Sequence, residues 1–137
     1  MLISYFSSLF TSTNPSVFEP VIKGELPRVT RAMNEDLLRP FEPEEAKFAL
    51  KQMDADMAPG PNGFPPFFYK KFWNKVGVEV TEAVLSALNS GTIPKDLNHT
   101  YLTLIPKIQS PRKVTDFRPI SLSNVLYKII AKVLANP

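Results

Sequence analysis

The chain has 137 residues, of which 44% are hydrophobic, so it can bury one core and is ordinary for a globular domain. It has no cysteine and one histidine, which excludes a disulfide framework and a thiolate metal site and argues against a histidine-rich zinc site. Residues 1–98 carry ten Lys/Arg and twelve Asp/Glu (−2), and residues 99–137 carry six and one (+5), which gives the net +3. The basic end favours a polyanionic partner such as nucleic acid, and a solvated basic face is the equally simple alternative.

The first forty residues form the least regular part of the sequence. Apolar side chains at positions 5, 6, 9 and 10 predict one helix face, and Pro15, Pro20 and Pro27 limit any further helix to short turns. The apolar N-terminus has no basic segment and contains serines, so it is a poor signal peptide, and it is too short to span a bilayer. We expect a lead-in segment with short helices over residues 1–40, in a protein located in the nucleus or cytoplasm.

A domain is expected over residues 41–137, and it begins with a helix. Pro43 suits the first helical position, and Glu44 and Glu45 lie in the first turn, near the positive end of the helix dipole. A loop comes next over residues 54–66, since its glycines and prolines support neither a helix nor a central strand. The side chains expected to be buried around the helix are Phe41, Ala46, Ala49, Leu50 and Met53.

Two more helices are predicted after the loop. The first covers about residues 67–75, and the second begins near Gly77 and ends at residues 89–91, where a residue of positive φ is expected. The side chains predicted to point inward are Phe68, Phe72 and Trp73 in the first helix and Val80, Val84, Ala87 and Leu88 in the second.

After Pro94 the pattern becomes typical of strands. Residues 100–105 are rich in β-branched and aromatic side chains and predict a strand ended by Pro106, and extended character resumes over residues 117–122. The two strands are expected to form a hairpin with a long basic tip. A final helix from Asn124 should bury Val125, Ile129, Ile130, Val133 and Leu134. The fold class is therefore α+β, with a mostly helical N-terminal part, a two-stranded hairpin and a C-terminal helix.

Two features are candidates for binding. Lys107 and Arg118 lie at the adjoining ends of the two strands, so a hairpin would bring both cations to one surface, where they suit a triphosphate or a nucleic-acid backbone. The alternative is that both are solvent-facing strand ends. The loop at residues 58–64 could direct backbone amides toward a ligand. It lacks the lysine and Ser/Thr of a Walker-type loop, so a rigid structural turn is the simpler interpretation.

The acidic residues do not predict a metal site. Asp54 and Asp56 belong to a loop, and Asp116 stands alone beside the basic hairpin. Polymerases and nucleases hold two metal ions with carboxylates that converge on one site. No such pair is evident, so no catalytic or metal-binding residue is predicted.

Three blocks in this order resemble the reverse transcriptases of LINE-type, non-LTR retrotransposons, especially those of plants. They are Met-Ala-Pro-Gly-Pro-Asn-Gly-Phe at 57–64, residues 98–107 ending in Leu-Ile-Pro-Lys, and residues 116–132 beginning with Asp-Phe-Arg-Pro-Ile-Ser-Leu. The resemblance covers about residues 30–136. It implies part of a right-hand polymerase fold, the N-terminal extension and fingers, without palm and thumb.

The resemblance also implies roles for particular residues. Lys107 and Arg118 would face the phosphates of the incoming deoxynucleotide, and Pro61, Asn62 and Gly63 would form a loop near the template strand. The complete enzyme uses an RNA template, a DNA primer, deoxynucleotides and magnesium. Two departures remove one charge of each sign from the loop: methionine at 57 replaces the family's lysine, and asparagine at 62 replaces its aspartate.

The palm aspartates of this family do not occur in the sequence. We therefore expect an RNA-directed DNA polymerase fragment that is catalytically inactive alone, binds no cofactor and binds nucleic acid weakly. Pro137 stands where the family continues a helix, which suggests a truncation or a frame disruption. Two alternatives remain open, a stand-alone RNA-binding module and an unstable pseudogene product.

Overall fold

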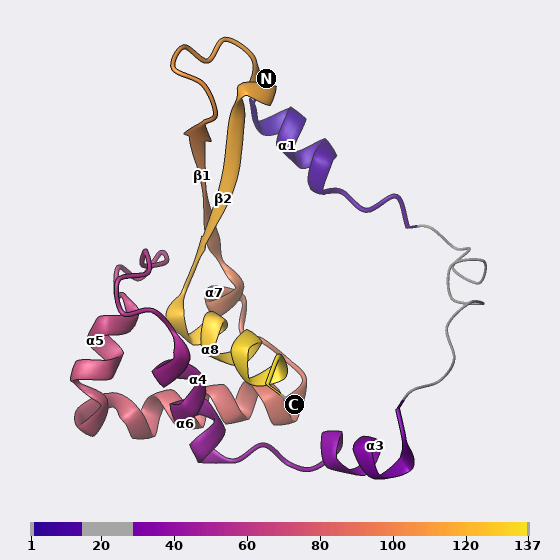
Figure 1. Cartoon of the computed structure of the whole chain (residues 1–137), viewed down its shortest axis with the longest axis vertical. Coiled ribbons are helices and arrows are strands. Elements are labelled where there is room, and N and C mark those ends of the chain that lie inside the picture. The colour runs from indigo at the N-terminus through magenta and orange to yellow at the C-terminus, as the bar shows by residue number, and fades with distance from the viewer. Residues whose placement is uncertain (1, 15–28, 137) are drawn as a thin grey trace. The chain divides into compact units, whose positions relative to one another are not determined.

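The computed structural model describes residues 2–14 and 29–136. Helices and one two-stranded sheet account for its regular structure, so the predicted α+β class is confirmed (Figure 1). The chain divides into two compact units, residues 1–38 with 106–118 and residues 39–105 with 119–137. The domain boundary expected at residue 40 stays a prediction. The short turns expected around Pro15, Pro20 and Pro27 lie outside the described residues.

The described residues of the first unit include two α-helices. Helix α1 (Leu2–Phe10) forms where the apolar pattern predicted a helix, but of the four residues of the predicted face Phe6 is buried while Tyr5, Leu9 and Phe10 are exposed. Helix α3 (Arg31–Leu37) was not predicted. The hydroxyl of Thr30 accepts a hydrogen bond from the Met33 amide at 3.2 Å, which caps the helix. An exposed Arg31–Glu35 ion pair at 2.8 Å adds an i,i+4 contact. All residues of α3 are exposed, so the helix has no buried apolar face from which the periodicity of its sequence could have predicted it.

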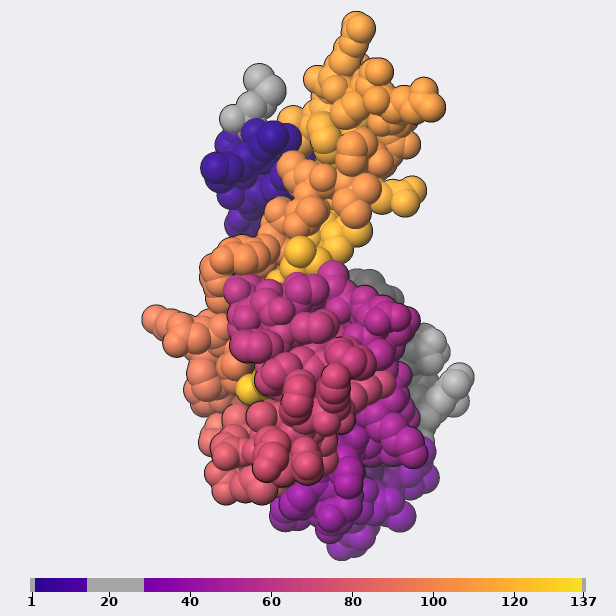
Figure 2. Space-filling model, turned by 90° about the vertical axis from the view of Figure 1, so that its left-hand side faces the viewer, coloured from indigo at the N-terminus to yellow at the C-terminus, as the bar shows by residue number. Residues whose placement is uncertain are grey.

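The core of the second unit lies where α4 (Pro43–Gln52), α6 (Trp73–Ser90) and α8 (Val125–Leu134) pack together. Helix α4 begins at Pro43 as predicted, with a capping box between Glu42 and Glu45. Helices α4, α6 and α8 are called the helical body below. In Figure 2 the residues coloured from magenta to salmon, which include α4 and α6, form a continuous surface. The buried faces of α4 and α6 are confirmed. In α8 Leu134 is exposed, contrary to prediction, because it is the last helical residue and no further turn covers it. The core consists of Ala46, Ala49, Leu50, Met53, Tyr69, Val80, Val84, Ala87, Val125, Ile129, Ile130 and Val133.

The helix predicted over residues 67–75 is wrong in its bounds and in one inward side chain. Helix α5 (Pro66–Lys71) ends at Phe72, whose φ of −105° and ψ of 20° interrupt the helix before α6 begins at Trp73. Phe72 lies at the interruption and is 41% exposed, whereas Tyr69, which was not predicted to point inward, is the buried aromatic residue of α5. Phe68 and Trp73 pack partly buried against the core, as predicted. Helix α6 ends at Gly91, whose φ is +66°, which confirms the predicted left-handed end.

The hairpin consists of β1 (Thr100–Pro106) and β2 (Phe117–Ser123), as predicted, and comes after a short helix α7 (Lys95–Asn98) that was not predicted. The Lys107 amide donates to the Asp116 carbonyl at 2.7 Å, so residues whose numbers add to 223 face each other. In this register Pro106 lies opposite Phe117 in a non-hydrogen-bonded pair, where its missing N–H would point outward. Most hairpin side chains are exposed, and in the described residues the sheet has only these two strands.

Among the described helices, none has the length and apolar character needed to cross a membrane.

Candidate nucleic-acid interface

The hairpin tip, residues 106–118, concentrates positive charge. It carries four cations and one carboxylate, a net charge of +3 over thirteen residues. All four cationic residues are exposed, so they keep most of their hydration and can approach a large polyanion at little desolvation cost. The cations are Lys107, Arg112, Lys113 and Arg118.

Asp116 fixes the backbone of this tip. Its carboxylate accepts hydrogen bonds from the amides of Arg112 at 2.9 Å and Lys113 at 2.8 Å, and it closes the 3-10 turn η1 (Val114–Asp116). These backbone bonds, with a smaller contribution from the Lys107 charge, hold the pKa of Asp116 below its ordinary value of 3.8. The only acidic group of the tip is therefore directed to backbone amides, which leaves the cationic side chains to other partners.

Lys107 and Arg118 both lie at the base of the tip. Lys107 directly follows β1, and Arg118 is the second residue of β2, so the hairpin register brings the two positions near each other in the ladder. The Lys107 ammonium donates to the Thr115 carbonyl at 2.8 Å. In the described part of the chain Arg118 makes no ion pair. Their convergence on one surface and their role in phosphate binding both stay predictions.

The loop predicted to lie near the template belongs to the helical unit. The Gly63 amide donates to the Gly60 carbonyl at 3.0 Å, and Gly63 has a φ of +76°, so the chain turns sharply here. Gly60 is buried against the junction of β2 and α8. A Cβ at Gly60 would lie 2.4 Å from the Asn124 nitrogen and 2.4 Å from the Ser123 carbonyl carbon. Only glycine fits there, so the loop is anchored by direct backbone packing.

Asn62 ties the loop to two other elements. Its amide nitrogen donates to Asn124 Oδ1 at 3.2 Å, and its side-chain Nδ2 donates to the Tyr69 hydroxyl at 3.1 Å. Its own Oδ1 accepts from the Phe64 amide at 3.3 Å, which closes an Asx turn. Burial raises the pKa of the Tyr69 hydroxyl, and the bond from Asn62 partly opposes that shift. The loop is therefore held in one conformation by its own asparagine.

Asn124 and Lys128 complete the anchoring, and the sequence did not identify them as site residues. Asn124 is a polar residue that is only 5% exposed, and its Nδ2 donates to the Asp96 carbonyl at 3.2 Å. Lys128 extends its ammonium to the Ala58 carbonyl at 2.8 Å, and desolvation lowers its pKa from the ordinary value of 10.5. An asparagine before an apolar run signals a helix start, and α8 does begin there. Its contacts with residues 28 and 62 positions away carry no local signal.

The acidic loop residues keep a structural role. Asp54 Oδ1 accepts from the Asp56 amide at 3.1 Å, which forms a local turn. In residues 2–14 and 29–136 no three His, Cys, Asp or Glu side chains gather in a way that could hold a metal ion. The expectation that the chain holds neither metal nor cofactor stays a prediction.

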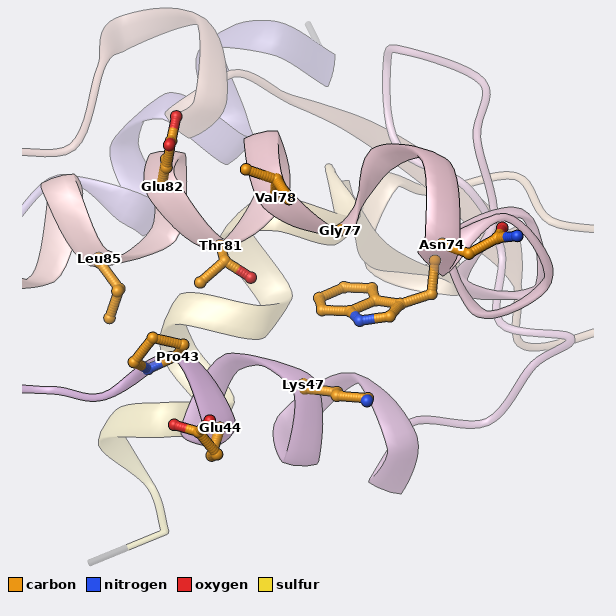
Figure 3. Close-up of a pocket in the computed structure, with 10 residues that line it drawn as sticks. Pro43, Glu44, Lys47, Asn74, Gly77, Val78, Thr81, Glu82 and Leu85 are labelled. Carbon is orange, nitrogen blue, oxygen red and sulfur yellow. The ribbon is translucent and has the colours of Figure 1, made fainter.

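A groove of about 600 Å³ lies between α4 and α6. Figure 3 shows Glu44 and Lys47 on its α4 side and Val78, Thr81 and Glu82 on its α6 side. Its charged residues are of both signs, so it has no clear preference for an anion. We assign it no ligand.

No protein-family profile matches the chain. Two curated proteins are similar to nearly all of it. It is 30% identical over 134 residues to the transposon TX1 uncharacterized 149 kDa protein of Xenopus laevis, a match over 96% of this chain and 10% of that protein. It is 25% identical over 138 residues to the retrovirus-related Pol polyprotein from type-2 retrotransposable element R2DM of Drosophila melanogaster, a match over 98% of this chain and 12% of that protein.

The chain is therefore related to proteins of transposable elements. More narrowly, it is related to proteins of non-LTR retrotransposons, and it spans about a tenth of the length of the two relatives.

Proposed function

We propose that the chain forms the N-terminal extension and fingers of a non-LTR retrotransposon reverse transcriptase, an RNA-directed DNA polymerase, and that the hairpin tip binds phosphates. The observation that carries the proposal is that Lys107 and Arg118 are both exposed at the base of a tip with a net charge of +3. The similarity to a Pol polyprotein supports the same assignment.

The two cations suit this task in different ways. The guanidinium of Arg118 can donate two parallel hydrogen bonds to one phosphate, and the ammonium of Lys107 acts as a compact point charge. A polymerase must neutralise the triphosphate of the incoming nucleotide while the primer attacks it, and fixed cations at the phosphates lower that electrostatic cost. Asp116 holds the tip backbone in place through the Arg112 and Lys113 amides, so the two cations project from a fixed turn.

The anchored loop is the proposed contact with the template strand. Pro61, Asn62 and Gly63 lie on a turn whose base is fixed by Gly60, and open space surrounds the position where Gly63 would carry a Cβ. A strand can approach such a backbone closely because no side chain intervenes. Since the turn is held before any ligand arrives, binding would not have to order it.

A direct binding experiment tests the assignment of the tip. Fluorescence anisotropy would measure affinity of the purified chain for an RNA template annealed to a DNA primer at several salt concentrations. Lys107→Ala with Arg118→Ala should weaken binding and reduce the slope of log affinity against log salt by about two, one per lost phosphate contact. Lys95→Ala, an exposed lysine on α7, is the matched control and should leave the slope unchanged.

An unchanged slope in the double variant would refute phosphate binding by the tip. Equal affinity for unprimed RNA and for the template–primer would instead favour the stand-alone RNA-binding module.

We further propose that the chain alone, within the nucleus or cytoplasm, does not synthesise DNA, because magnesium would be held by carboxylates of a palm domain. Primer extension by the purified chain on an RNA template, with magnesium and deoxynucleotides, would disprove this part.

A further inference from the structure

Helix α5 and its flanks expose an aromatic surface that the proposed function does not use. The phenylalanine–lysine surface is defined by Phe64, Phe67, Phe72 and Lys71. The three phenylalanines are 43%, 51% and 41% exposed, in the order of the chain. Large aromatic side chains gathered in this way on a surface usually mark a binding site, since exposing them to water is unfavourable.

The rings are held in a fixed arrangement. The centroids of Phe64 and Phe68 lie 4.5 Å apart with planes tilted by 37°, and those of Phe68 and Phe72 lie 5.2 Å apart with planes tilted by 48°. Phe68 packs against the core, so it anchors the two outer rings. The Lys71 ammonium lies 5.5 Å from the centroid of Phe67 and 5.7 Å from that of Phe72. A single cation therefore lies between two exposed rings.

The sequence segment that carries this surface has charges of one sign, although the Phe67 amide donates to the Ala55 carbonyl at 3.1 Å, which places Asp54 and Asp56 beside the segment. Residues 57–78 contain Lys70, Lys71 and Lys75 and no Asp or Glu, a net charge of +3 over 22 residues. Lys70 donates to the Lys51 carbonyl at 3.1 Å and to the Met53 carbonyl, so it is engaged in packing. In the described part of the chain neither Lys71 nor Lys75 makes an ion pair. The cationic charge next to the rings is thus available to an anionic ligand.

We propose that the phenylalanine–lysine surface binds single-stranded RNA by stacking unpaired bases on its exposed rings. Stacking on aromatic side chains beside backbone-tracking cations is how proteins hold unpaired strands with little sequence preference. A duplex keeps its base faces covered by neighbouring pairs, so it cannot use the rings. The proposal rests on the proposed function for its choice of nucleic acid as partner. It assigns a separate surface, with no residue shared with the hairpin tip.

The test compares two probes on the full chain, a twelve-nucleotide oligoadenylate and a twelve-base-pair RNA duplex. Phe67→Ala with Phe72→Ala should weaken oligoadenylate binding by about tenfold or more and leave duplex binding and the salt slope unchanged. Phe48→Ala is the matched control, because Phe48 is 55% exposed on α4 and lies between Lys47 and Lys51 in sequence. It should change neither affinity by more than about twofold.

A second variant separates loss of stacking from loss of fold. Phe67→Leu with Phe72→Leu keeps apolar bulk and removes the flat faces, so it should lose oligoadenylate affinity while its urea midpoint stays near that of the parent chain. Unchanged oligoadenylate binding in a folded double variant, or an equal loss on both probes, would overturn the proposal. So would an effect seen only on phosphatidylserine vesicles, which would indicate a membrane surface.

The outcome also distinguishes this inference from the proposed function. If Lys107 and Arg118 can be replaced without effect while the ring variants lose single-strand affinity, the stacking surface stands and the tip assignment fails. If the tip variants lose affinity and the ring variants do not, the tip assignment stands and the stacking surface fails.

Discussion

The helical body and the hairpin are stabilised in different ways. In the body α4, α6 and α8 contribute ten of the twelve core residues, and among them Ile129, Val84 and Val125 have no exposed surface. In the hairpin most side chains are exposed, and the tip is fixed by backbone hydrogen bonds and by the Asp116 carboxylate. The body derives its stability from burial, whereas the hairpin derives its shape from local hydrogen bonds.

This difference separates stability from recognition. Lys107 and Arg118 lie where few buried contacts depend on them, so their charge can be changed without unfolding the body. Pro61, Asn62 and Gly63 differ from them, because their loop is packed against the β2–α8 junction. Substitutions at the tip should therefore affect binding first, and substitutions at the base of the loop should affect folding first.

The largest expected difference in stability is between two isoleucine variants, one in the helical body and one in the hairpin. Ile129→Ala empties a fully buried position of the core and should cost about 4 kcal/mol of unfolding free energy, through lost burial and the cavity left behind. Ile120→Ala, on a strand position that is 41% exposed, should cost less than about 1 kcal/mol. Urea unfolding followed by circular dichroism measures both. Equal losses would show that the hairpin is as tightly packed as the body.

A pair of glycines in the loop gives the next effect. Gly60→Ala would force a Cβ into backbone atoms 2.4 Å away and should cost about 3 kcal/mol, since neither Ser123 nor Asn124 can move without shifting a strand and a helix. Gly63→Ala meets open space and should cost only about 1 kcal/mol, from its positive φ. A reversed order of the two urea midpoints would contradict the anchoring of the loop at its base.

The asparagine at the β2–α8 junction should have a smaller effect. Asn124→Ala removes the acceptor of the Asn62 amide and the donor to the Asp96 carbonyl, and should cost about 2 kcal/mol because these groups lose their partners. Asn74→Ala, on an exposed position of α6, is the matched control and should change stability by less than about 0.5 kcal/mol. Hydrogen exchange of the Asn62 amide should quicken in the first variant alone. Retained protection would mean that the bond to Asn124 does not hold the loop.

Periodicity predicted the buried helices and the hairpin because their patterns are local. Val80, Val84 and Ala87 fall on one helical face wherever the helix begins, so an error of four residues in the start of α6 did not change which of them is buried. Phe72 shows the limit of this reasoning. The unbroken run of aromatic and lysine residues over 67–73 suits one continuous helix, and nothing in the sequence indicates the interruption that exposes this ring.

The sequence predicted one part of the candidate site, the strand-end cations, but not the other, the partners of the loop. The hairpin register is a local feature, so the sequence was enough to place Lys107 and Arg118 at adjoining strand ends, and their convergence on one surface stays a prediction. The partners of the loop could not be found in this way, because Tyr69, Asn124 and Lys128 reach it from other elements. Such contacts between distant segments depend on tertiary packing, which local patterns do not encode.

The smallest effect concerns acidification of the hairpin tip. The pKa of Asp116 is lower in the folded chain than its ordinary value of 3.8, so its carboxylate stabilises the tip fully above pH 3.8. That contribution is lost as the pH falls below 3.8 through the folded pKa. NMR signals of the Arg112 and Lys113 amides should shift in this range, because protonation weakens the bonds that they donate to Asp116.

Asp116→Asn is the control, because its side chain does not titrate and the two amide signals should lose their pH dependence in this range. The amide of Ile129 in the core should not show the same transition, since no titratable group is bonded to its buried side chain in the described structure. If the Ile129 signal changed together with those of the tip, the hairpin and the body would unfold as one unit. The claim that the tip is held by local hydrogen bonds, independently of the buried core of the body, would then be wrong.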